Sequence, residues 1–180
     1  VDAVRQTGQG EVVAVASRSG ARARDFAAAN GIPQSYGDYA EMLEKVACDC
    51  AYVATVPSSH AQLCRLCLDH SRPVLCEKTM FRNYAEASEI FALAQAKGLF
   101  IMEAMWSKFL PAIRTARRWL EEGRIGPPRF VDVAIGFAAP TDPEGRYFNR
   151  ELGGGVALDI TVYAYQLVPF LLPYDWQVEA

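Results

Sequence analysis

Short apolar runs alternate with segments of helical periodicity along much of the chain. The apolar runs cover residues 11–17, 50–56, 73–77 and 99–103, and each predicts a buried strand. The helical segments cover residues 21–30, 38–47, 59–70, 84–98 and 111–123. Continuously apolar strands separated by helices are typical of a parallel sheet that is covered on both faces. The pattern therefore predicts an α/β fold with a doubly wound parallel sheet.

Residues that start or stop helices stand at the predicted helix ends. Gly31 follows the first helical segment as its C-terminal stop, and Asp38 precedes the second as its N-cap. Asn83, with Glu86 three residues later, gives a start similar to a capping box, and Pro111 lies in the first turn of the last segment. The helix assignments therefore have support beyond periodicity.

The start of the chain lacks the glycine-rich turn of a dinucleotide-binding fold. Such a turn lies between a strand and a helix, whereas Gly8 and Gly10 come before the first predicted strand. We therefore interpret residues 1–7 as the remainder of a helix, and we expect the first strand and its glycine-rich turn to be missing. On this interpretation the chain is a fragment that lacks its start.

Ligands of doubly wound folds bind beyond the carboxyl ends of the strands. In this chain those ends are residues 17–18, 55–57, 77–78 and 103. Glu77 and Lys78 place a carboxylate and an ammonium side by side, which predicts a functional pair at the rim of a crevice. The alternative is a lysine that forms a surface salt bridge at a strand end.

The alternation of apolar runs and helical segments ends after the helical segment at residues 111–123. Residues 129–138 are a long run with strand propensity, and a polar loop and a helical stretch at residues 151–172 follow. Asp159 and Tyr163 are four residues apart in that stretch, so we expect both side chains on the same side of a helix. The alternative is a helix-start carboxylate and a core tyrosine. Three glycines at 153–155 favour function, because they allow the backbone to approach another element or a ligand closely.

Composition narrows the function classes. The chain has 18 basic and 21 acidic residues and no sustained basic run, so we expect no nucleic-acid partner. Its apolar runs stop short of the roughly 18 residues that a membrane span needs, so we expect no membrane partner. The five cysteines lie mostly in apolar segments, which indicates reduced thiols and a cytoplasmic location.

Four side chains that could bind a metal recur at helical spacing. They are His60, Cys64, Cys67 and His70, which could share one face of the helix predicted at residues 59–70. Ligands strung along one helix cannot close a tetrahedron around zinc without help from elsewhere. We therefore interpret the group as core packing and expect no metal site, with zinc as the alternative.

Three motifs carry a resemblance to a known family. They are Glu77-Lys78-Thr79 with Asn83 four positions after the threonine, residues 98–112 and residues 151–163. Together they resemble the glucose-fructose oxidoreductase / inositol dehydrogenase (Gfo/Idh/MocA) family of NAD(P)-dependent oxidoreductases. Residues 98–112 are most similar to its branch of dimeric dihydrodiol dehydrogenases and NADP-dependent D-xylose dehydrogenases. Thr79 stands where the family has proline, and family chains are nearly twice as long.

The resemblance implies two domains and a redox function. Residues 1–107 would form a partial dinucleotide-binding Rossmann domain, and residues 108–180 would begin an α+β open-sheet domain for substrate binding and oligomerisation. The protein would transfer a hydride between NADP and a secondary alcohol or carbonyl of a polyol, sugar or trans-dihydrodiol, as a homodimer or larger homo-oligomer. The alternatives are a non-catalytic NAD(P)-binding regulator and an inactive fragment.

The same resemblance implies roles for the site residues. Lys78 would lie beside the nicotinamide and stabilise negative charge on the substrate oxygen, and Glu77 would orient it, so both would contact the cofactor. Tyr163 would be the general acid/base, and Asp159 would hydrogen-bond the substrate or position the tyrosine. Trp106 would form a wall of the substrate pocket, or else pack in an interface or in the core.

The end of the first predicted strand bears on the choice of cofactor. NAD enzymes usually place an acid there, whereas Ser17 and Arg18 suit the 2′-phosphate of NADP. We therefore expect NADP, with NAD as the alternative. Thr55, Pro57 and His60 would line the dinucleotide track, although His60 could instead cap its helix.

Overall fold

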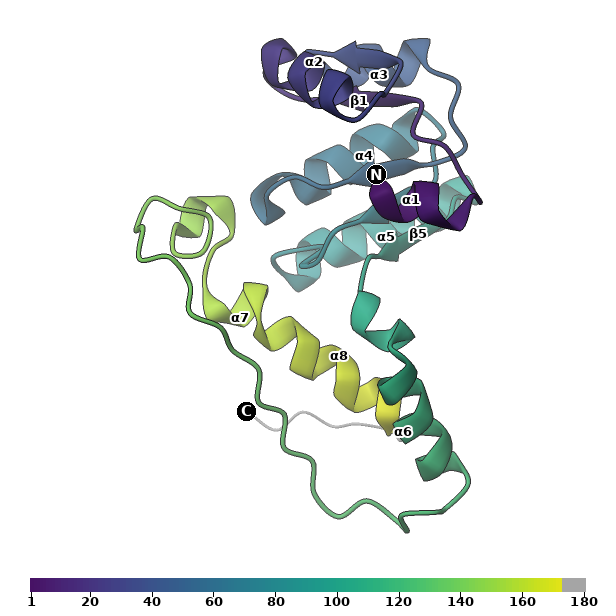
Figure 1. Ribbon diagram of the computed structural model, residues 1–180, viewed down its shortest axis with the longest axis vertical. Helices are drawn as coiled ribbons and strands as arrows, with labels where there is room; N and C mark the ends of the chain where they lie inside the picture. Colours follow the sequence, from purple (N-terminus) through teal and green to yellow (C-terminus); the bar gives the residue numbers. More distant parts are fainter. Residues whose placement is uncertain (173–180) are drawn as a thin grey trace.

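The computed structural model describes residues 1–172, and it has the predicted alternation of strands and helices (Figure 1). Its strands are Ala14–Ala16 (β1), Gln34–Tyr36 (β2), Ala51–Val53 (β3), Val74–Cys76 (β4) and Ile101–Glu103 (β5). β1 pairs with β2, and β4 pairs with both β3 and β5, in each case in parallel. The predicted parallel, Rossmann-like α/β fold is therefore confirmed.

The helices lie before, between and after these strands. The strand-containing part holds α1 (Asp2–Thr7), α2 (Gly20–Ala29), α3 (Tyr39–Lys45), η1 (Pro57–Ser59, a 3-10 helix), α4 (His60–Asp69) and α5 (Tyr84–Lys97). The following part holds η2 (Trp106–Phe109), α6 (Pro111–Glu121), η3 (Arg150–Leu152), α7 (Val156–Asp159) and α8 (Thr161–Leu171). Helix α1 agrees with the interpretation of residues 1–7 as helical.

The predicted helix caps form. The Asp38 carboxylate accepts a hydrogen bond from the backbone N–H of Glu41 at 2.8 Å, and the Asn83 side chain accepts one from the N–H of Glu86 at 2.9 Å. The Glu86 carboxylate accepts from the N–H of Arg82 at 3.0 Å, so the reciprocal bond of the capping box reaches one residue further back than Asn83. Local sequence therefore determines where α3 and α5 begin.

The main core lies between the three-stranded sheet and helices α4 and α5. Its most buried side chains, each at most 1% exposed, include Cys64, Leu68, Val74, Cys76 and Ile90. Cys67 is buried beside them, and burial raises the pKa of its thiol to about 12. These cysteines act as small apolar core residues, which agrees with the packing interpretation.

The sheet is divided into two parts. β1 and β2 form one sheet, β3, β4 and β5 form another, and no strand of the described residues joins β1 to β3. Both parts are parallel and carry their helices in the order that a doubly wound fold requires. The expectation of a further strand and a glycine-rich turn stays a prediction.

Two strand assignments from the sequence differ from the structure. The prediction of a strand at residues 129–138 is wrong, because no strand forms there. A strand needs a hydrogen-bonding neighbour, and the described chain offers none to this run. Conversely, the sequence pattern does not predict β2, which is short, polar and paired on one side only.

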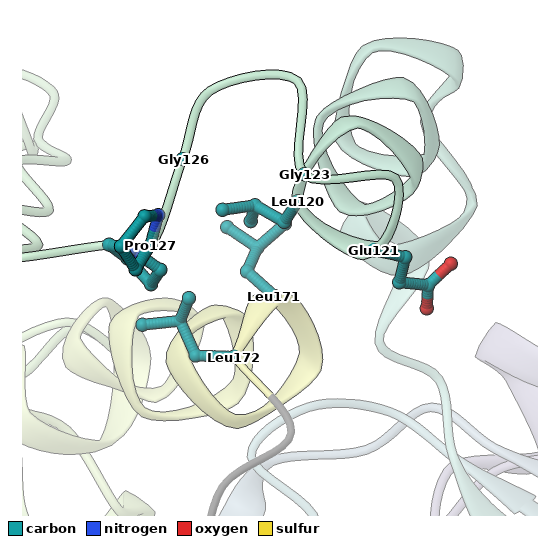
Figure 2. A pocket seen from close by; sticks show the side chains of 8 residues that line it. Leu120, Glu121, Gly123, Gly126, Pro127, Leu171 and Leu172 are labelled. Carbon is teal, nitrogen blue, oxygen red and sulfur yellow. The ribbon is translucent and has the colours of Figure 1, made fainter.

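The part after β5 is helical. Helices α6 and α8 pack side by side below the sheets, and η2 connects α6 to β5 (Figure 1). A hollow of about 360 Å³ lies between their ends, lined by Leu120, Glu121, Gly123, Gly126, Pro127, Pro128, Leu171 and Leu172. Figure 2 shows the Glu121 carboxylate directed away from this hollow, so the other lining side chains of the described residues are apolar.

The helices of the described residues are too short or too polar to cross a membrane singly. Within residues 1–172 no single helix is both long and apolar enough, while the bent pair Arg150–Asp159 and Thr161–Leu171, at 44°, meets the criteria of length and composition only when taken together.

Candidate active site

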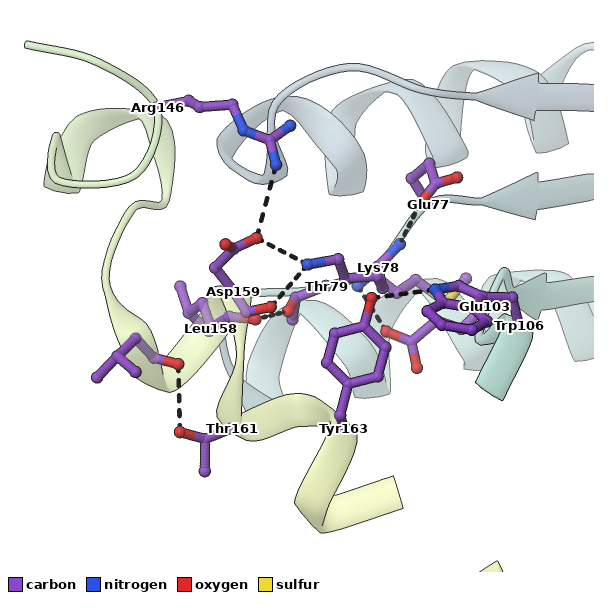
Figure 3. Close-up of polar contacts among 12 residues, drawn as sticks. Glu77, Lys78, Thr79, Glu103, Trp106, Arg146, Leu158, Asp159, Thr161 and Tyr163 are labelled. Carbon is purple, nitrogen blue, oxygen red and sulfur yellow. Dashed lines mark hydrogen bonds and ion pairs between the residues drawn. The ribbon is translucent and has the colours of Figure 1, made fainter. Parts of the chain in front are cut away.

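The ammonium of Lys78 lies where the two parts of the chain meet. Lys78 follows β4, and its Nζ atom donates to Asp159 Oδ1 at 2.7 Å and to the Asp159 backbone oxygen at 2.6 Å (Figure 3). The two side chains are 15% and 20% exposed, although 81 residues separate them in the sequence. A partly buried ion pair with two short hydrogen bonds fixes the position of the ammonium.

Tyr163 and Trp106 complete a cluster around this ammonium. The Lys78 Nζ atom lies 5.0 Å from the centroid of the Tyr163 ring, and the Tyr163 hydroxyl accepts a hydrogen bond from Trp106 Nε1 at 3.1 Å. The two aromatic rings meet edge to face with centroids 6.0 Å apart. Tyr163 is 8% exposed whereas Trp106 is 56% exposed, so Trp106 forms the solvent side of the cluster.

Asp159 and Tyr163 reach Lys78 from the same side, as their spacing predicts, but not from one helix. Asp159 ends α7, Tyr163 lies in the first turn of α8, and Ile160 breaks the helix between them with φ −118°. The prediction of a single helix is therefore wrong. The two side chains nevertheless converge, since both contact the Lys78 ammonium.

The residue that departs from the family pattern makes a contact of its own. The Thr79 hydroxyl donates a hydrogen bond to the backbone oxygen of Leu158 (Figure 3). A proline at this position has no such donor. The peptide bond between Lys78 and Thr79 is cis. Thr79 therefore links the turn that carries Lys78 to the residue next to Asp159.

Two of the three glycines make the close approach that the sequence predicts. A Cβ atom added at Gly153, which has φ +82°, would lie 2.8 Å from Cβ of Pro57. One added at Gly154 would lie 2.8 Å from the backbone oxygens of Arg146 and Asn149. Both distances are too short for a Cβ atom. Gly153 therefore allows its segment to pack on η1, and Gly154 allows the loop that contains Arg146 and Asn149 to fold back on itself.

Glu77 contacts backbone rather than the neighbouring ammonium. Its carboxylate accepts a hydrogen bond from the Lys78 N–H at 3.2 Å and another from the Tyr52 hydroxyl. Partial desolvation of the Tyr52 phenol, together with this hydrogen bond, raises its pKa. Glu77 is therefore held at the end of β4 beside the turn, where it can orient Lys78 through the main chain.

Four of the residues predicted to bind the cofactor, Ser17, Arg18, Thr55 and Pro57, lie at the carboxyl ends of β1 and β3. Ser17 Oγ accepts from the N–H of Ser19 at 3.3 Å, and the exposed Arg18 forms no ion pair with a residue of the described range. Thr55 Oγ1 accepts from Ser59 Oγ at 2.7 Å, in the turn that contains Pro57. The structure brings Pro57 close to the glycine segment, whereas Ser17 and Arg18 lie on the other sheet.

His60 is the first residue of α4, and its ring is fully buried. Its Nδ1 atom lies 2.9 Å from the backbone oxygen of Thr79, and its Nε2 atom lies 3.0 Å from that of Thr55. The ring therefore does not cap its helix. Among residues 1–172 no group of three or more His, Cys, Asp or Glu side chains is arranged to hold a metal ion.

One further charged residue reaches the cluster without a sequence pattern that predicts it. Arg146 lies in the polar loop before η3, and its Nη2 atom is 3.7 Å from Asp159 Oδ1 (Figure 3). Its side chain is 60% exposed, so this contact is screened by water. The loop carries no periodicity that would place Arg146 beside Asp159.

Family models match both parts of the chain. The model described as "Oxidoreductase family, NAD-binding Rossmann fold" matches residues 1–105, and the model described as "GFO/IDH/MocA C-terminal domain" matches residues 113–177. The chain belongs to the GFO/IDH/MocA oxidoreductase family. This membership confirms the resemblance that the three sequence motifs indicated, and it gives the strand-containing part an NAD(P)-binding Rossmann fold.

Proteins with similar sequences include two that are named trans-1,2-dihydrobenzene-1,2-diol dehydrogenase. The one from Mus musculus is 38% identical over 161 residues, and the one from Xenopus laevis is 37% identical over 158 residues. The matches cover 89% and 88% of this chain but 48% and 47% of those proteins. The chain therefore spans about half the length of the curated relatives it matches.

Solved structures of oxidoreductases share this fold. The WlbA dehydrogenase from Bordetella pertussis, in complex with NADH and UDP-GlcNAcA, superposes with a TM-score of 0.86 at 19% identity. The match covers 96% of this chain and 55% of the WlbA chain. The aldose-aldose oxidoreductase from Caulobacter crescentus, complexed with glycerol, has a TM-score of 0.77 at 25% identity, and the match covers 91% of this chain and 50% of the oxidoreductase chain. Both parts of this chain therefore adopt a fold that is known in GFO/IDH/MocA oxidoreductases.

Proposed function

We propose that the full-length protein is an NADP-dependent dehydrogenase that oxidises a secondary alcohol of a small polyol, sugar or trans-dihydrodiol, or reduces the corresponding carbonyl. The observation that carries this proposal is the position of the Lys78 ammonium, which contacts both the Asp159 carboxylate and the Tyr163 ring. This cluster suits alcohol oxidation, because a fixed cation can stabilise negative charge on the substrate oxygen and a phenol can act as general acid/base.

The chemistry of these residues follows from their arrangement. A nicotinamide cofactor held at the carboxyl ends of the strands would supply the acceptor for the hydride of the carbinol carbon. Tyr163, as a phenolate, takes the hydroxyl proton in oxidation, and the phenol returns it in reduction. Lys78 stabilises the negative charge that develops on the substrate oxygen, while Asp159 holds the ammonium in place and accepts a hydrogen bond from a second substrate hydroxyl.

The strand ends support a dinucleotide as the cofactor. The carboxyl ends of parallel strands share one edge, so the turns after β3 and β4 lie next to each other, as the His60 ring between Thr55 and Thr79 shows. Ser17 and Arg18, at the end of β1, lack the acid that would hold the ribose hydroxyls of NAD. The exposed Arg18 guanidinium supports binding of the 2′-phosphate of NADP.

The names of the relatives support a small hydroxylated substrate. The similar sequences are named as dehydrogenases of a dihydrodiol, and one structural neighbour was crystallised with glycerol. Trp106 is half exposed beside Tyr163, so its ring can form an apolar wall against the carbon face of such a substrate.

We further propose that residues 1–107 form a dinucleotide-binding domain and that residues 108–180 belong to a domain for substrate binding and oligomerisation. We also propose that the full-length protein is a homodimer or a larger homo-oligomer. Large apolar side chains in the 130–137 run support an oligomer, because Phe130 is 84% exposed and Phe137 is 54% exposed. Sedimentation of the full-length protein as a monomer at every concentration would contradict the oligomer.

A direct test measures NADP reduction by the full-length protein with trans-dihydrodiols of benzene, D-xylose and glycerol. Lys78→Met should lower kcat by at least about a hundredfold and change the dissociation constant of NADPH by less than about tenfold, because the ammonium acts mainly in the transition state. Lys45→Met is the matched control, since Lys45 is exposed and pairs with Glu41 on its own helix, away from the cluster around Lys78. NADPH binding without turnover of any alcohol would instead favour a non-catalytic regulator.

A further inference from the structure

The His60 ring is a buried polar group that has no part in the proton and hydride chemistry. It is fully inaccessible, and each ring nitrogen lies at hydrogen-bond distance from a backbone oxygen, that of Thr79 at 2.9 Å and that of Thr55 at 3.0 Å. A neutral imidazole donates to one of these oxygens at a time, and an imidazolium donates to both. Ordinary packing does not require an imidazole here, because an apolar side chain of similar size would fill the same space.

The two carbonyl groups belong to different functional turns. Thr79 follows Lys78 directly, so its carbonyl is part of the backbone that aims the ammonium. Thr55 starts the turn that leads into η1, and Pro57 of that turn packs against Gly153 with no room for a side chain. One ring therefore joins the turn of Lys78, the turn after β3 and, through η1, the glycine segment before Asp159.

We infer that His60 is a positioning residue. It fixes the position of the Lys78 ammonium relative to the turn after β3, without contacting the cofactor or the substrate. This inference rests on the proposed function. Loss of the ring would release the carbonyl of Thr79 and allow the Lys78 turn to shift, and a displacement of about 1 Å at a catalytic group can reduce turnover about a hundredfold. The cofactor site would weaken at the same time, since Thr55 would lose its fixed carbonyl.

The chain provides a matched control in its second histidine. His70 follows the last residue of the same helix, and its Nδ1 atom lies 2.8 Å from the backbone oxygen of Leu66. It thus makes a histidine-to-carbonyl hydrogen bond at the end of α4 opposite to His60. Substitution of His70 removes a comparable bond and leaves both functional turns untouched.

The experiment compares His60→Leu, His60→Gln and His70→Leu in the full-length protein. We expect His60→Leu to lower kcat by about ten- to a hundredfold and to raise the dissociation constant of NADPH several-fold, while His70→Leu changes both by less than about twofold. His60→Gln keeps an N–H donor and should recover part of the loss. Equal losses for His60→Leu and His70→Leu, at similar stability towards urea, would overturn the inference.

A second comparison separates positioning from general loss of structure. If His60 acts through Lys78, the Gln variant should reduce kcat by less than about threefold when Lys78 is already methionine, because the two changes remove the same interaction. A full multiplicative loss in that background would show that His60 acts elsewhere.

A readout independent of turnover keeps this inference apart from the proposed function. Hydrogen exchange of the backbone at 77–81 should become faster in His60→Gln and stay unchanged in His70→Leu. If the unmodified protein binds NADPH but oxidises no alcohol, the proposed dehydrogenase function fails, and the exchange data and NADPH affinity still decide the role of His60. Unchanged exchange at 77–81 in His60→Gln would overturn that role.

Discussion

Replacement of Gly153 by alanine tests whether the glycine segment builds the site. Gly153 has φ +82°, where an L-residue with a Cβ atom costs about 1–2 kcal/mol. The added Cβ atom would also lie 2.8 Å from Cβ of Pro57 and 3.3 Å from the backbone nitrogen of Ser58, atoms that cannot rotate away. Overpacking of this kind costs about 1–3 kcal/mol. The variant should therefore lose about 2–5 kcal/mol of stability.

The matched control for this change is Gly98→Ala. Gly98 ends α5 with φ +62°, and a Cβ atom there would meet no atom within 4 Å. It should thus lose only the conformational contribution of about 1–2 kcal/mol. The difference between the two variants, about 1–3 kcal/mol, isolates the contact between Gly153 and Pro57.

Urea unfolding of the two variants, followed by fluorescence, measures this difference, and turnover measures its effect on the site. Gly153→Ala must push η3 away from η1, and Asp159 follows Gly153 by six residues, so its contact with Lys78 should weaken. We expect kcat to fall at least about tenfold in Gly153→Ala and to stay within about twofold in Gly98→Ala. Equal stability and full turnover of both variants would refute the reasoning.

Three other predictions concern the cluster, the cofactor and the thiols. Tyr163→Phe removes one hydroxyl and keeps the ring, so kcat should fall about a hundredfold or more while the free energy of unfolding falls by only about 1 kcal/mol. If turnover of the variant, measured across the pH range, equals that of the unmodified protein, Tyr163 is not the acid/base. Arg18→Asp should reverse or abolish the preference for NADP over NAD, and equal use of both cofactors by the unmodified protein would contradict this expectation. Iodoacetamide at pH 8 should label the exposed Cys50 in the native protein and spare Cys67, because Cys67 is buried and the pKa of its thiol is raised to about 12. Mass spectrometry of the peptides identifies which of the two cysteines is labelled.

The sequence predicts the strands that are buried on both faces, because such strands must be apolar throughout. β4 comes nearest to this kind, with Val74 and Cys76 buried and Leu75 half-buried, whereas β3 buries Ala51 and Val53 but exposes Tyr52 on its other face. The apolar runs of both strands stand out from the flanking helices. β2 has no such run, since its residues Gln34, Ser35 and Tyr36 are polar or amphipathic and pair only with β1. Its strand conformation comes from that pairing, which no local pattern reveals. The run at 129–138 shows the converse, because high strand propensity without a neighbouring strand forms no ladder.

Lys78 could be predicted because its location follows from a rule about strand ends, which needs only local sequence. Its partner Asp159 could be proposed from its spacing to Tyr163, but the spacing does not reveal that Ile160 breaks the helix. The bond between Thr79 and the Leu158 carbonyl was not predictable either, since it depends on how the later part of the chain folds back. Contacts between distant segments are set by tertiary packing, which sequence periodicity does not encode.

The cluster depends on a junction between two parts of the chain. Lys78 comes from the strand-containing part, whereas Asp159 and Tyr163 come from the helices after it. An ammonium withdrawn from water is costly unless a carboxylate lies beside it, so Lys78 needs the second part to be docked. The packing of Gly153 on η1 and the Thr79 hydrogen bond to Leu158 hold this junction on either side of the ion pair. A change that separates the two parts should therefore remove the partner of Lys78 and the proposed acid/base together, so activity should be lost at smaller perturbations than those that unfold either part.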